Sequence, residues 1–484
     1  KDFKPYVDYF NSMEDENIAQ AIPNARASQW MEENIPLFEC SQKNFEEMYY
    51  YRWWTLRKHI KETPVGYGMT EFLVNRSYAD KYNLIACAIG HHIYESRWLR
   101  NPEYLNQIIH TWYRGNEGGP MAKMTKFSSW NADAVLGRYM VDGNKEFLLD
   151  MVKDLEAEYA RWEKTNRLPN GLYWQGDVQD GMEESISGGR RKQYARPTIN
   201  SYMYGNAKAL SLIGIMTGDE GMAMKYGLKA DSIKTLVQDK LWNTDHHFFE
   251  TMRGDASAQV REAIGYIPWY FNLPDASSKY TVAWKEVMDE KGFSAPYGLT
   301  TAERRHPEFR THGVGKCEWD GAVWPFASAQ TLTAMANFMN NYPQTVLTDS
   351  VYFHHMERYV ESQHHRGRPY IGEYLDEVTG YWLKGDQERS RYYNHSTFND
   401  LMITGLIGLR PRMDNTVEVN PLIPEGKWDY FCLDNVLYHG RNLTILWDKD
   451  GSRYQRGKGL HIYVDGKEVG HADTLTRVLC ENVL

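Results

Sequence analysis

The sequence predicts a long α-helical domain followed by a small antiparallel β domain. Apolar residues recur at helical spacing through most of residues 28–410, and strand-like alternation replaces that spacing after Pro411. No alternating strand–helix rhythm is present, which disfavours a parallel α/β sheet. We therefore expect a lead-in segment at 1–27, a helical domain at 28–410 and a β domain at 411–484.

Helical periodicity is clearest in four stretches of the long domain. These are residues 82–90, 146–159, 202–216 and 327–339. Loops rich in Gly, Pro and Asn separate them, as at Leu168-Pro-Asn-Gly and Ser294-Ala-Pro-Tyr-Gly. At roughly 30 residues for each helix and its loop, the domain has room for about twelve helices.

Three short segments near the end of the chain alternate like strands. They are Val417–Asn420, Leu443–Trp447 and Leu460–Val464. The dipeptide Asp465-Gly466 follows the last of them and is typical of a type I′ hairpin turn.

Composition excludes several classes of protein. Among 484 residues, 64 Asp and Glu outnumber 55 Lys and Arg, giving a net charge of -9 without a basic stripe. Nucleic-acid binding is therefore not expected, because phosphate neutralisation supplies most of that affinity. No apolar run reaches the roughly 18 residues of a membrane helix. The 16 Trp and 34 Tyr suit a cleft that stacks on sugar rings, although core packing also uses them.

The cysteines and the first residue give some indication of the cellular compartment. The five cysteines are odd in number, widely spaced and without a CxxC pair, so neither a disulfide framework nor a zinc ribbon is expected. The chain starts at Lys1 and shows no signal peptide. We expect a periplasmic or secreted protein whose leader has been removed, with a cytoplasmic location as the alternative. The oligomeric state stays open.

The first of four loops that carry chemistry spans residues 173–185 and is rich in acids. Beside Trp174 it contains Asp177, Asp180, Glu183 and Glu184. Clustered carboxylates raise one another's pKa, which can keep one of them protonated as a general acid. The alternatives are a solvated acidic loop or a calcium loop, although the EF-hand spacing is missing.

The second loop, Cys317–Phe326, combines aromatic residues with an acid. Trp319 and Trp324 flank Asp320 and Gly321, and a glycine there would allow a ligand to approach the backbone. A structural alternative is a helix entry, with Pro325 in the first turn and a packed Trp.

The third and fourth loops lie further along the chain. In Arg368–Trp382, Glu373 precedes Tyr374 and is a candidate base, with an exposed acid as the alternative. In Tyr392–Leu401, Asn394 and His395 could bond sugar hydroxyls, with a buried structural histidine as the alternative. Ser396 or Thr397 could cap the helix that follows.

No metal or cofactor motif is recognisable. Adjacent histidines at 91–92, 246–247, 354–355 and 364–365 face different directions on a helix, so we expect structural or surface roles. HExxH, Walker A, GxGxxG and GxSxG patterns are missing. We expect neither a metal nor a cofactor.

Three of these loops resemble motifs of the six-hairpin glycosidases, which include trehalases, glycoside hydrolase family 63 α-glucosidases and mannosylglycerate hydrolases. Asp180-Gly-Met-Glu-Glu-Ser185 resembles their acid loop, Glu373-Tyr-Leu-Asp-Glu-Val-Thr-Gly380 their base loop, and Trp319-Asp-Gly-Ala-Val-Trp-Pro325 their Trp-Pro motif. The resemblance implies an (α/α)6 barrel with a small C-terminal β-sandwich. It also implies Glu183 as general acid and Glu373 as general base.

The sequence departs from the family pattern in ways that leave alternatives open. Asp180 stands where the pattern has Ser, and Glu183 where it has Asp. Because Glu184 follows directly, either glutamate could be the acid. The QxGFGWTNG motif of trehalases is missing, which disfavours trehalose.

The resemblance implies an inverting exo-acting hydrolase for an α-linked glucose- or mannose-type glycan, with an oligosaccharide or glycoside as its partner. The expected substrate-binding residues are Trp174, Asp177, Asp180, Glu184, Arg196, Trp319, Asp320, Trp324, Tyr374, Asn394 and His395. Arg196 could instead brace the acid loop. The alternatives are a furanosidase (β-L-arabinofuranosidase-like) or a phosphorylase on the same barrel, and a non-catalytic glycan-binding protein.

Overall fold

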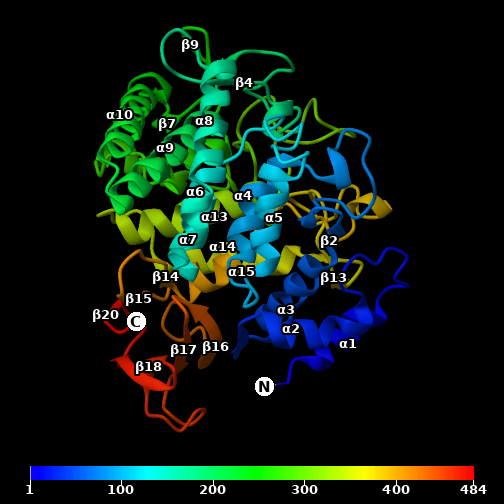
Figure 1. The fold of residues 1–484 in the computed structure, drawn as a ribbon. Coiled ribbons are helices and arrows are strands. Elements are labelled where there is room, and N and C mark those ends of the chain that lie inside the picture. Colours follow the sequence, from blue (N-terminus) through cyan, green and yellow to red (C-terminus); the bar gives the residue numbers. More distant parts are fainter. Residues whose placement is uncertain (1) are drawn as a thin grey trace.

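Six helical elements close into a ring in the computed structural model, which describes residues 2–484 (Figure 1). Each packs against the next in chain order, and the last packs back against the first. They are α4 (Ile89–Ser96), α6 (Asn131–Asp142), α9 (Pro197–Thr217), α11 (Ile267–Tyr270), α13 (Pro325–Asn341) and α15 (Asn399–Leu401). This is the inner ring of an (α/α)6 barrel, which confirms the expected fold class.

The other helices lie outside this ring. α10 and α8 pack against α9, α14 packs against α13 and α3, and α1 and α2 pack against α3. Their bounds are α1 (Lys4–Ser12), α2 (Ala27–Asn34), α3 (Lys43–Lys58), α5 (Glu103–Arg114), α7 (Lys145–Asp150), α8 (Val152–Asn166), α10 (Glu220–Leu236), α12 (Ser278–Thr281) and α14 (Asp349–Ser362).

An aromatic cluster fills the centre of the ring. The fully buried Trp130 packs edge-on against His91 and Phe326, with ring centroids 5.0 and 6.1 Å away. A Cβ atom at Gly90 would lie 2.1 Å from the Trp130 ring. Glycine at this point of α4 therefore allows the indole to reach the barrel axis.

Local sequence signals account for most of the predicted helices. α9 and α13 contain the two stretches predicted at 202–216 and 327–339, and each begins with a proline, whose fixed φ suits a first helical turn. The prediction over 82–90 was wrong for its first part. Tyr82 and Asn83 take left-handed φ values of 62° and 61°, and α4 begins only at Ile89.

The helix after the fourth loop is capped by a distant residue. The Glu95 carboxylate accepts hydrogen bonds from the backbone N–H groups of Phe398, Asn399 and Asp400, at 2.7–3.0 Å. The predicted cap by Ser396 or Thr397 was therefore wrong. The carboxylate comes from the neighbouring inner helix, so the ring itself fixes where α15 starts.

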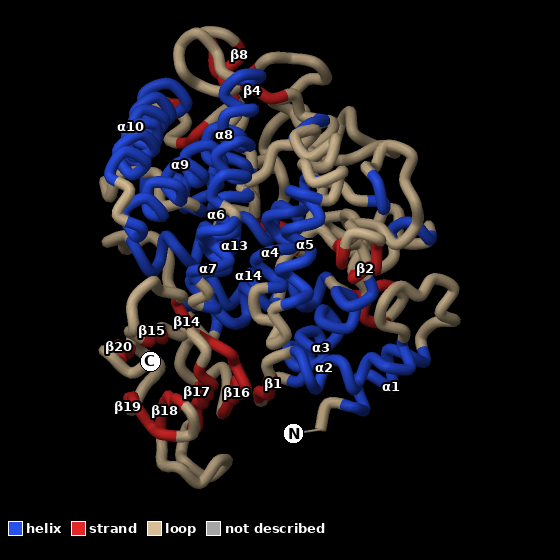
Figure 2. Tube along the Cα trace, viewed as in Figure 1, coloured by secondary structure: helices blue, strands red, loops and turns tan. Residues whose placement is uncertain are grey.

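Two antiparallel sheets form the C-terminal part of the structure. Their strands are coloured red near the label C in Figure 2. The larger has the strand order β1-β16-β17-β18-β19 and the smaller β14-β15-β20. Their bounds are β1 (Leu37–Cys40), β14 (Leu409–Arg410), β15 (Val417–Val419), β16 (Tyr430–Tyr438), β17 (Arg441–Asp448), β18 (Gly459–Val464), β19 (Lys467–Ala472) and β20 (Val478–Cys480). The three predicted strands are β15, β17 and β18.

Two details of these sheets bear on the sequence predictions. Asp465 and Gly466 have φ values of 49° and 82°, as a type I′ turn between β18 and β19 requires. β1 comes from the N-terminal part of the chain and pairs with β16, so the large sheet is completed across the expected boundary. That boundary at 410/411 stays a prediction.

Short strands stiffen the barrel loops. β4 (Trp174–Gln175), β5 (Tyr194–Ala195), β8 (Met252–Arg253) and β9 (Ala256–Ser257) form one small sheet. The pairs are β2 (Ile60–Thr63) with β3 (Gly66–Met69), β6 (Trp242–Asn243) with β7 (Phe248–Phe249), β10 (Ser294–Ala295) with β11 (Gly298–Leu299), and β12 (His364–His365) with β13 (Arg368–Pro369).

Candidate active site

The segments that precede the inner helices line a cavity of about 310 Å³. Three carboxyl groups from three different loops lie in its wall, namely those of Glu71, Glu183 and Glu373. Because the same end of each inner helix points here, residues far apart in sequence converge on one site. We call this space the catalytic cavity.

Glu183 lies in the loop between β4 and α9. Gly181, with a φ of 71°, ends the preceding turn and is followed by the buried Met182, so the next side chain faces the catalytic cavity. Burial, together with the charges of Glu373 and Asp177, raises the pKa of Glu183 to about 7. This carboxyl can therefore stay protonated near neutral pH, as a general acid must.

Glu184 faces a different space. Its φ of 67° turns the backbone, and its side chain lines a neighbouring cavity of about 380 Å³ together with Asp177. Its carboxylate lies 3.7 Å from both His312 Nδ1 and Lys316 Nζ. The two adjacent glutamates, which the sequence could not distinguish, thus line different cavities.

Glu373 is a buried carboxylate between two cations. Its Oε1 lies 3.7 Å from Lys384 Nζ and its Oε2 lies 3.9 Å from Arg389. Oε2 has no hydrogen-bond partner within residues 2–484. The Cys317 thiol is 3.8 Å from Oε1, and burial raises the pKa of that thiol to about 12. A carboxylate oxygen with a free lone pair can accept a proton from water.

Glu71 was missed by the sequence analysis. It accepts hydrogen bonds from Tyr393 Oη at 2.8 Å and Cys87 Sγ at 3.0 Å. Burial raises its pKa to about 7, and the charges of Glu373 and Glu183 add to the shift. It lies in Met69-Thr-Glu-Phe72, which has no acid cluster or repeat, so no local signal could have found it.

An aromatic column forms another part of the wall. Trp324 lines the catalytic cavity and stacks between Trp319 and Tyr374, with centroids 4.6 and 4.5 Å away. Tyr374 Oη donates to the backbone oxygen of Lys316 at 2.6 Å. Trp319 and Tyr374 thus support Trp324, and neither is among the residues that line the cavity.

His395 also lines the catalytic cavity. Burial lowers its pKa well below the usual value, and the neighbouring His91 and Arg52 lower it further, so its ring is neutral. Its Nε2 has no hydrogen-bond partner within residues 2–484, which leaves it able to bond a ligand.

Asp180 and Arg196 form a fully buried ion pair beneath the acid loop. Arg196 Nε donates to Asp180 Oδ2 at 2.7 Å, and Thr198 Oγ1 donates to the same oxygen at 2.5 Å. Ser128 donates to the other carboxylate oxygen. The pair braces the loop that holds Glu183, and neither residue lines the catalytic cavity.

Three more predicted sugar ligands bond within the protein or lie away from the cavity. Asp320 Oδ2 accepts from the backbone N–H groups of His312 and Gly313, at 3.0 and 2.8 Å. Asn394 Nδ2 donates to the backbone oxygen of Thr70 at 3.0 Å, which ties the fourth loop to the segment carrying Glu71. Trp174 is partly buried on β4 and does not line the catalytic cavity.

Within residues 2–484, no three His, Cys, Asp or Glu side chains are grouped as metal ligands would be. In the same range no helix combines the length and apolar character that crossing a bilayer requires.

A barrel of this type, with acids from the loops before its inner helices lining one cavity, has the arrangement of a glycosidase. Residues 81–396 match the family described as the mannosylglycerate hydrolase MGH1-like glycoside hydrolase domain, and residues 409–471 match the C-terminal domain of glycosyl hydrolase family 65. The chain belongs to the MGH1-like glycoside hydrolase domain family.

Solved structures give the same fold. A protein named sialidase is 83% identical, with a TM-score of 0.99 over 100% of this chain and 44% of its own. The family 63 mannosylglycerate hydrolase of Thermus thermophilus with glucose is 12% identical (TM-score 0.53), covering 74% of this chain and 99% of that one. The family 78 rhamnosidase of Bacillus sp. GL1 is also 12% identical (TM-score 0.57), covering 89% and 41%. This chain thus spans less than half of the sialidase.

Proposed function

We propose that this chain hydrolyses the terminal glycosidic bond of a glycan with inversion, using Glu183 as general acid and Glu373 as general base. The observation that carries the proposal is that both carboxyl groups line one cavity, with Glu183 buried near other acids and Glu373 beside two cations. Burial holds the Glu183 proton near neutral pH. Lys384 and Arg389 stabilise the charge of Glu373.

The mechanism follows from the positions of these two carboxyl groups. Glu183 protonates the glycosidic oxygen as the bond to the leaving group breaks. Glu373 removes a proton from water as that water attacks the anomeric carbon from the opposite face. Inversion requires the carboxyl groups to be about 6.5–9.5 Å apart, which leaves room for the water.

The dimensions of the catalytic cavity support exo action. At about 310 Å³ it lies at the lower end of the usual range for small-molecule sites, which suits one terminal sugar unit. Trp324, with both ring faces stacked on Trp319 and Tyr374, presents a ring edge to that unit, while His395 Nε2 can bond a hydroxyl. An α-linked glucose- or mannose-type unit is our first candidate substrate.

The test is product analysis by NMR on a panel of substrates. The panel contains α-linked glucosides and mannosides, mannosylglycerate, rhamnosides, arabinofuranosides and a sialoside. We expect one class to release a sugar whose first-formed anomer is inverted. A retained anomer would contradict the mechanism, and turnover of the arabinofuranoside alone would establish the furanosidase alternative. The sialoside arm tests the name of the 83% identical protein, of which this chain covers only part.

Phosphorolysis is a second candidate, because Lys126, Arg190 and Arg389 line the same cavity and could hold phosphate. The same assay distinguishes it. A phosphorylase would release a sugar 1-phosphate and stop when phosphate is removed. Hydrolysis at an unchanged rate in phosphate-free buffer would exclude it.

The activity should fall at alkaline pH. Glu183 must carry its proton to act as an acid, and its pKa is raised to about 7. Above that value kcat/KM should decrease about tenfold for each pH unit. A pH series of initial rates measures this limb, and the residual activity of Glu183→Gln should lack it. A wild-type profile that stays flat to pH 9 would contradict the assignment of Glu183 as the acid.

A further inference from the structure

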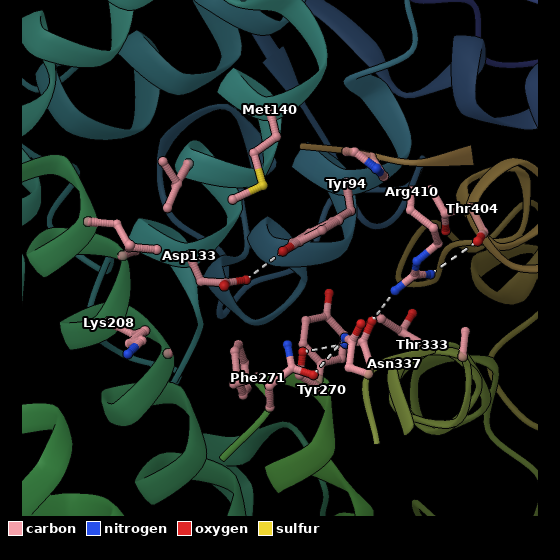
Figure 3. Close-up of a pocket in the computed structure, with 18 of the residues that line it drawn as sticks. Tyr94, Asp133, Met140, Lys208, Tyr270, Phe271, Thr333, Asn337, Thr404 and Arg410 are labelled. Carbon is pink, nitrogen blue, oxygen red and sulfur yellow. Dashed lines mark hydrogen bonds between the residues drawn. The ribbon is translucent and has the colours of Figure 1, made fainter. Parts of the chain in front are cut away.

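A second cavity, of about 620 Å³, lies inside the barrel at the end opposite the catalytic cavity (Figure 3). All six inner elements contribute to its wall, including Tyr94 on α4, Asp133 on α6, Lys208 on α9 and Thr333 on α13. Arg410, in the strand that follows the last inner helix, closes one side. We call this space the distal cavity.

An aromatic wall separates the two cavities. Phe326 lines the catalytic cavity and Tyr270 lines the distal one. Trp130 lies between them, donating from Nε1 to Tyr270 Oη at 3.1 Å and packing against Phe326. A ligand in the distal cavity therefore cannot touch Glu183 or Glu373.

The charged groups around the distal cavity are largely satisfied by the protein. Arg97 pairs with Asp400 at 2.8 Å, and Arg412 pairs with Glu418 at 2.8 Å. Arg410 donates to Asn337 Oδ1 at 2.7 Å and to the Thr404 backbone oxygen at 3.1 Å (Figure 3). Lys234 pairs with Asp275 at 2.8 Å, so three of the five cations in the wall already have a carboxylate partner, which favours an uncharged ligand.

Asp133 and Lys208 offer polar groups to a ligand. Asp133 Oδ2 accepts from Tyr94 Oη at 2.6 Å, while its Oδ1 receives no hydrogen bond from another side chain or backbone group in residues 2–484. Lys208 forms no ion pair with any group in that range and lies exposed at the mouth. Burial raises the pKa of Asp133 to about 7, so near neutral pH this carboxyl can both donate to and accept from a ligand hydroxyl, and Lys208 adds a cationic donor.

Aromatic side chains complete the wall. Tyr94, Tyr204, Tyr270 and Phe271 all line it. A Cβ atom at Gly205 would lie 2.3 Å from the Phe271 ring, so glycine at this point of α9 lets that ring form the wall. Rings that cover apolar sugar faces, beside groups that bond hydroxyls, are the usual chemistry of saccharide recognition.

We propose that the distal cavity is a non-catalytic binding site for an uncharged mono- or disaccharide. Its volume of about 620 Å³ is within the range of about 300–1,000 Å³ typical of small-molecule sites. Asp133 accepts from ligand hydroxyls, Lys208 donates to them, and the tyrosines and Phe271 contact the ring faces. This site is independent of the hydrolysis proposed above.

The experiment is calorimetry and ligand-observed NMR on the full chain carrying Glu183→Gln, which removes turnover. The probes are glucose, mannose, arabinose and maltose, with galacturonate and inorganic phosphate as anionic comparators. We expect one neutral sugar to bind at two sites for each chain. Adding Thr333→Phe, which fills the distal cavity, should leave one site. Lys208→Ala should weaken that second site at least tenfold.

Matched controls keep the outcome decisive. Lys225→Ala, an exposed lysine of α10 outside the cavity, should leave both sites unchanged. Because Lys208 is exposed, its truncation tests the site even if Thr333→Phe fails to fold. A single site that survives both Thr333→Phe and Lys208→Ala would overturn the proposal. Saturation by galacturonate or phosphate without any neutral sugar would overturn the uncharged ligand class.

Discussion

Replacing Glu183 by Gln is expected to lower kcat/KM on a natural glycoside by about 10²–10⁴-fold, the usual contribution of general acid catalysis. Glutamine keeps the shape of the side chain but has no proton to transfer. Initial rates of sugar release measure the effect. Glu184→Gln is the matched control, because that neighbouring side chain lines a different cavity. It should stay within about threefold of wild type.

Substrates with different leaving groups distinguish the role of the general acid from that of the general base. A nitrophenyl glycoside releases a weak base that needs little protonation, so Glu183→Gln should lose much less activity on it. Glu373→Gln should lose about 10²–10⁴-fold on both substrates, because water must be deprotonated whichever group leaves. Loss of activity in Glu184→Gln with an active Glu183→Gln would reverse the assignment of the acid.

Removing Asp180 should destabilise the protein by about 3–5 kcal/mol, because Arg196 would lose the carboxylate that pairs with its buried charge. Both side chains of this ion pair are fully buried, with Nε and Oδ2 2.7 Å apart. Thermal unfolding of Asp180→Ala at a fixed scan rate measures the loss. Asp150→Ala is the matched control, since Asp150 pairs with Arg114 at the surface and such pairs contribute about 0–1 kcal/mol.

A second substitution tests the physical cause. If the unpaired guanidinium is responsible, the double variant Asp180→Ala, Arg196→Met should recover much of the lost stability. An Asp180→Ala protein that unfolds at the wild-type temperature would show that the pair does not brace the acid loop. In that case activity lost by Asp180→Ala would point to a direct role in substrate binding.

Interactions between residues that are close in the sequence made parts of this fold predictable. The 3.6-residue spacing and N-terminal prolines mark α9 and α13, and Asp465-Gly466 marks its hairpin turn. These signals depend on neighbours in sequence, so a linear reading finds them. The start of α15 could not be found in this way, because its cap comes from Glu95 on another inner helix.

The residues of the candidate site also fall into two groups, those that sequence motifs indicate and those that only the fold brings together. The loops carrying Glu183 and Glu373 have recognisable motifs, and both side chains reach the catalytic cavity. Glu71 has no such motif and arrives there only because the ring closes. Asp180 and Arg196 looked like sugar ligands because charge clusters are common in active sites, yet they pair with each other beneath the loop.

The sequence by itself determined the helical and β composition, the acidic and aromatic loops and the two leading carboxylates. Only the tertiary structure decided that Glu183 and Glu184 line different cavities, because a left-handed φ at Glu184 turns the chain between them. Burial also depends on the assembled barrel, and burial is what raises the pKa of Glu183. The spacing of residues along the chain determines which side chains can share a face of a helix. The distances between side chains on different loops, and their burial from water, are set only when the ring closes.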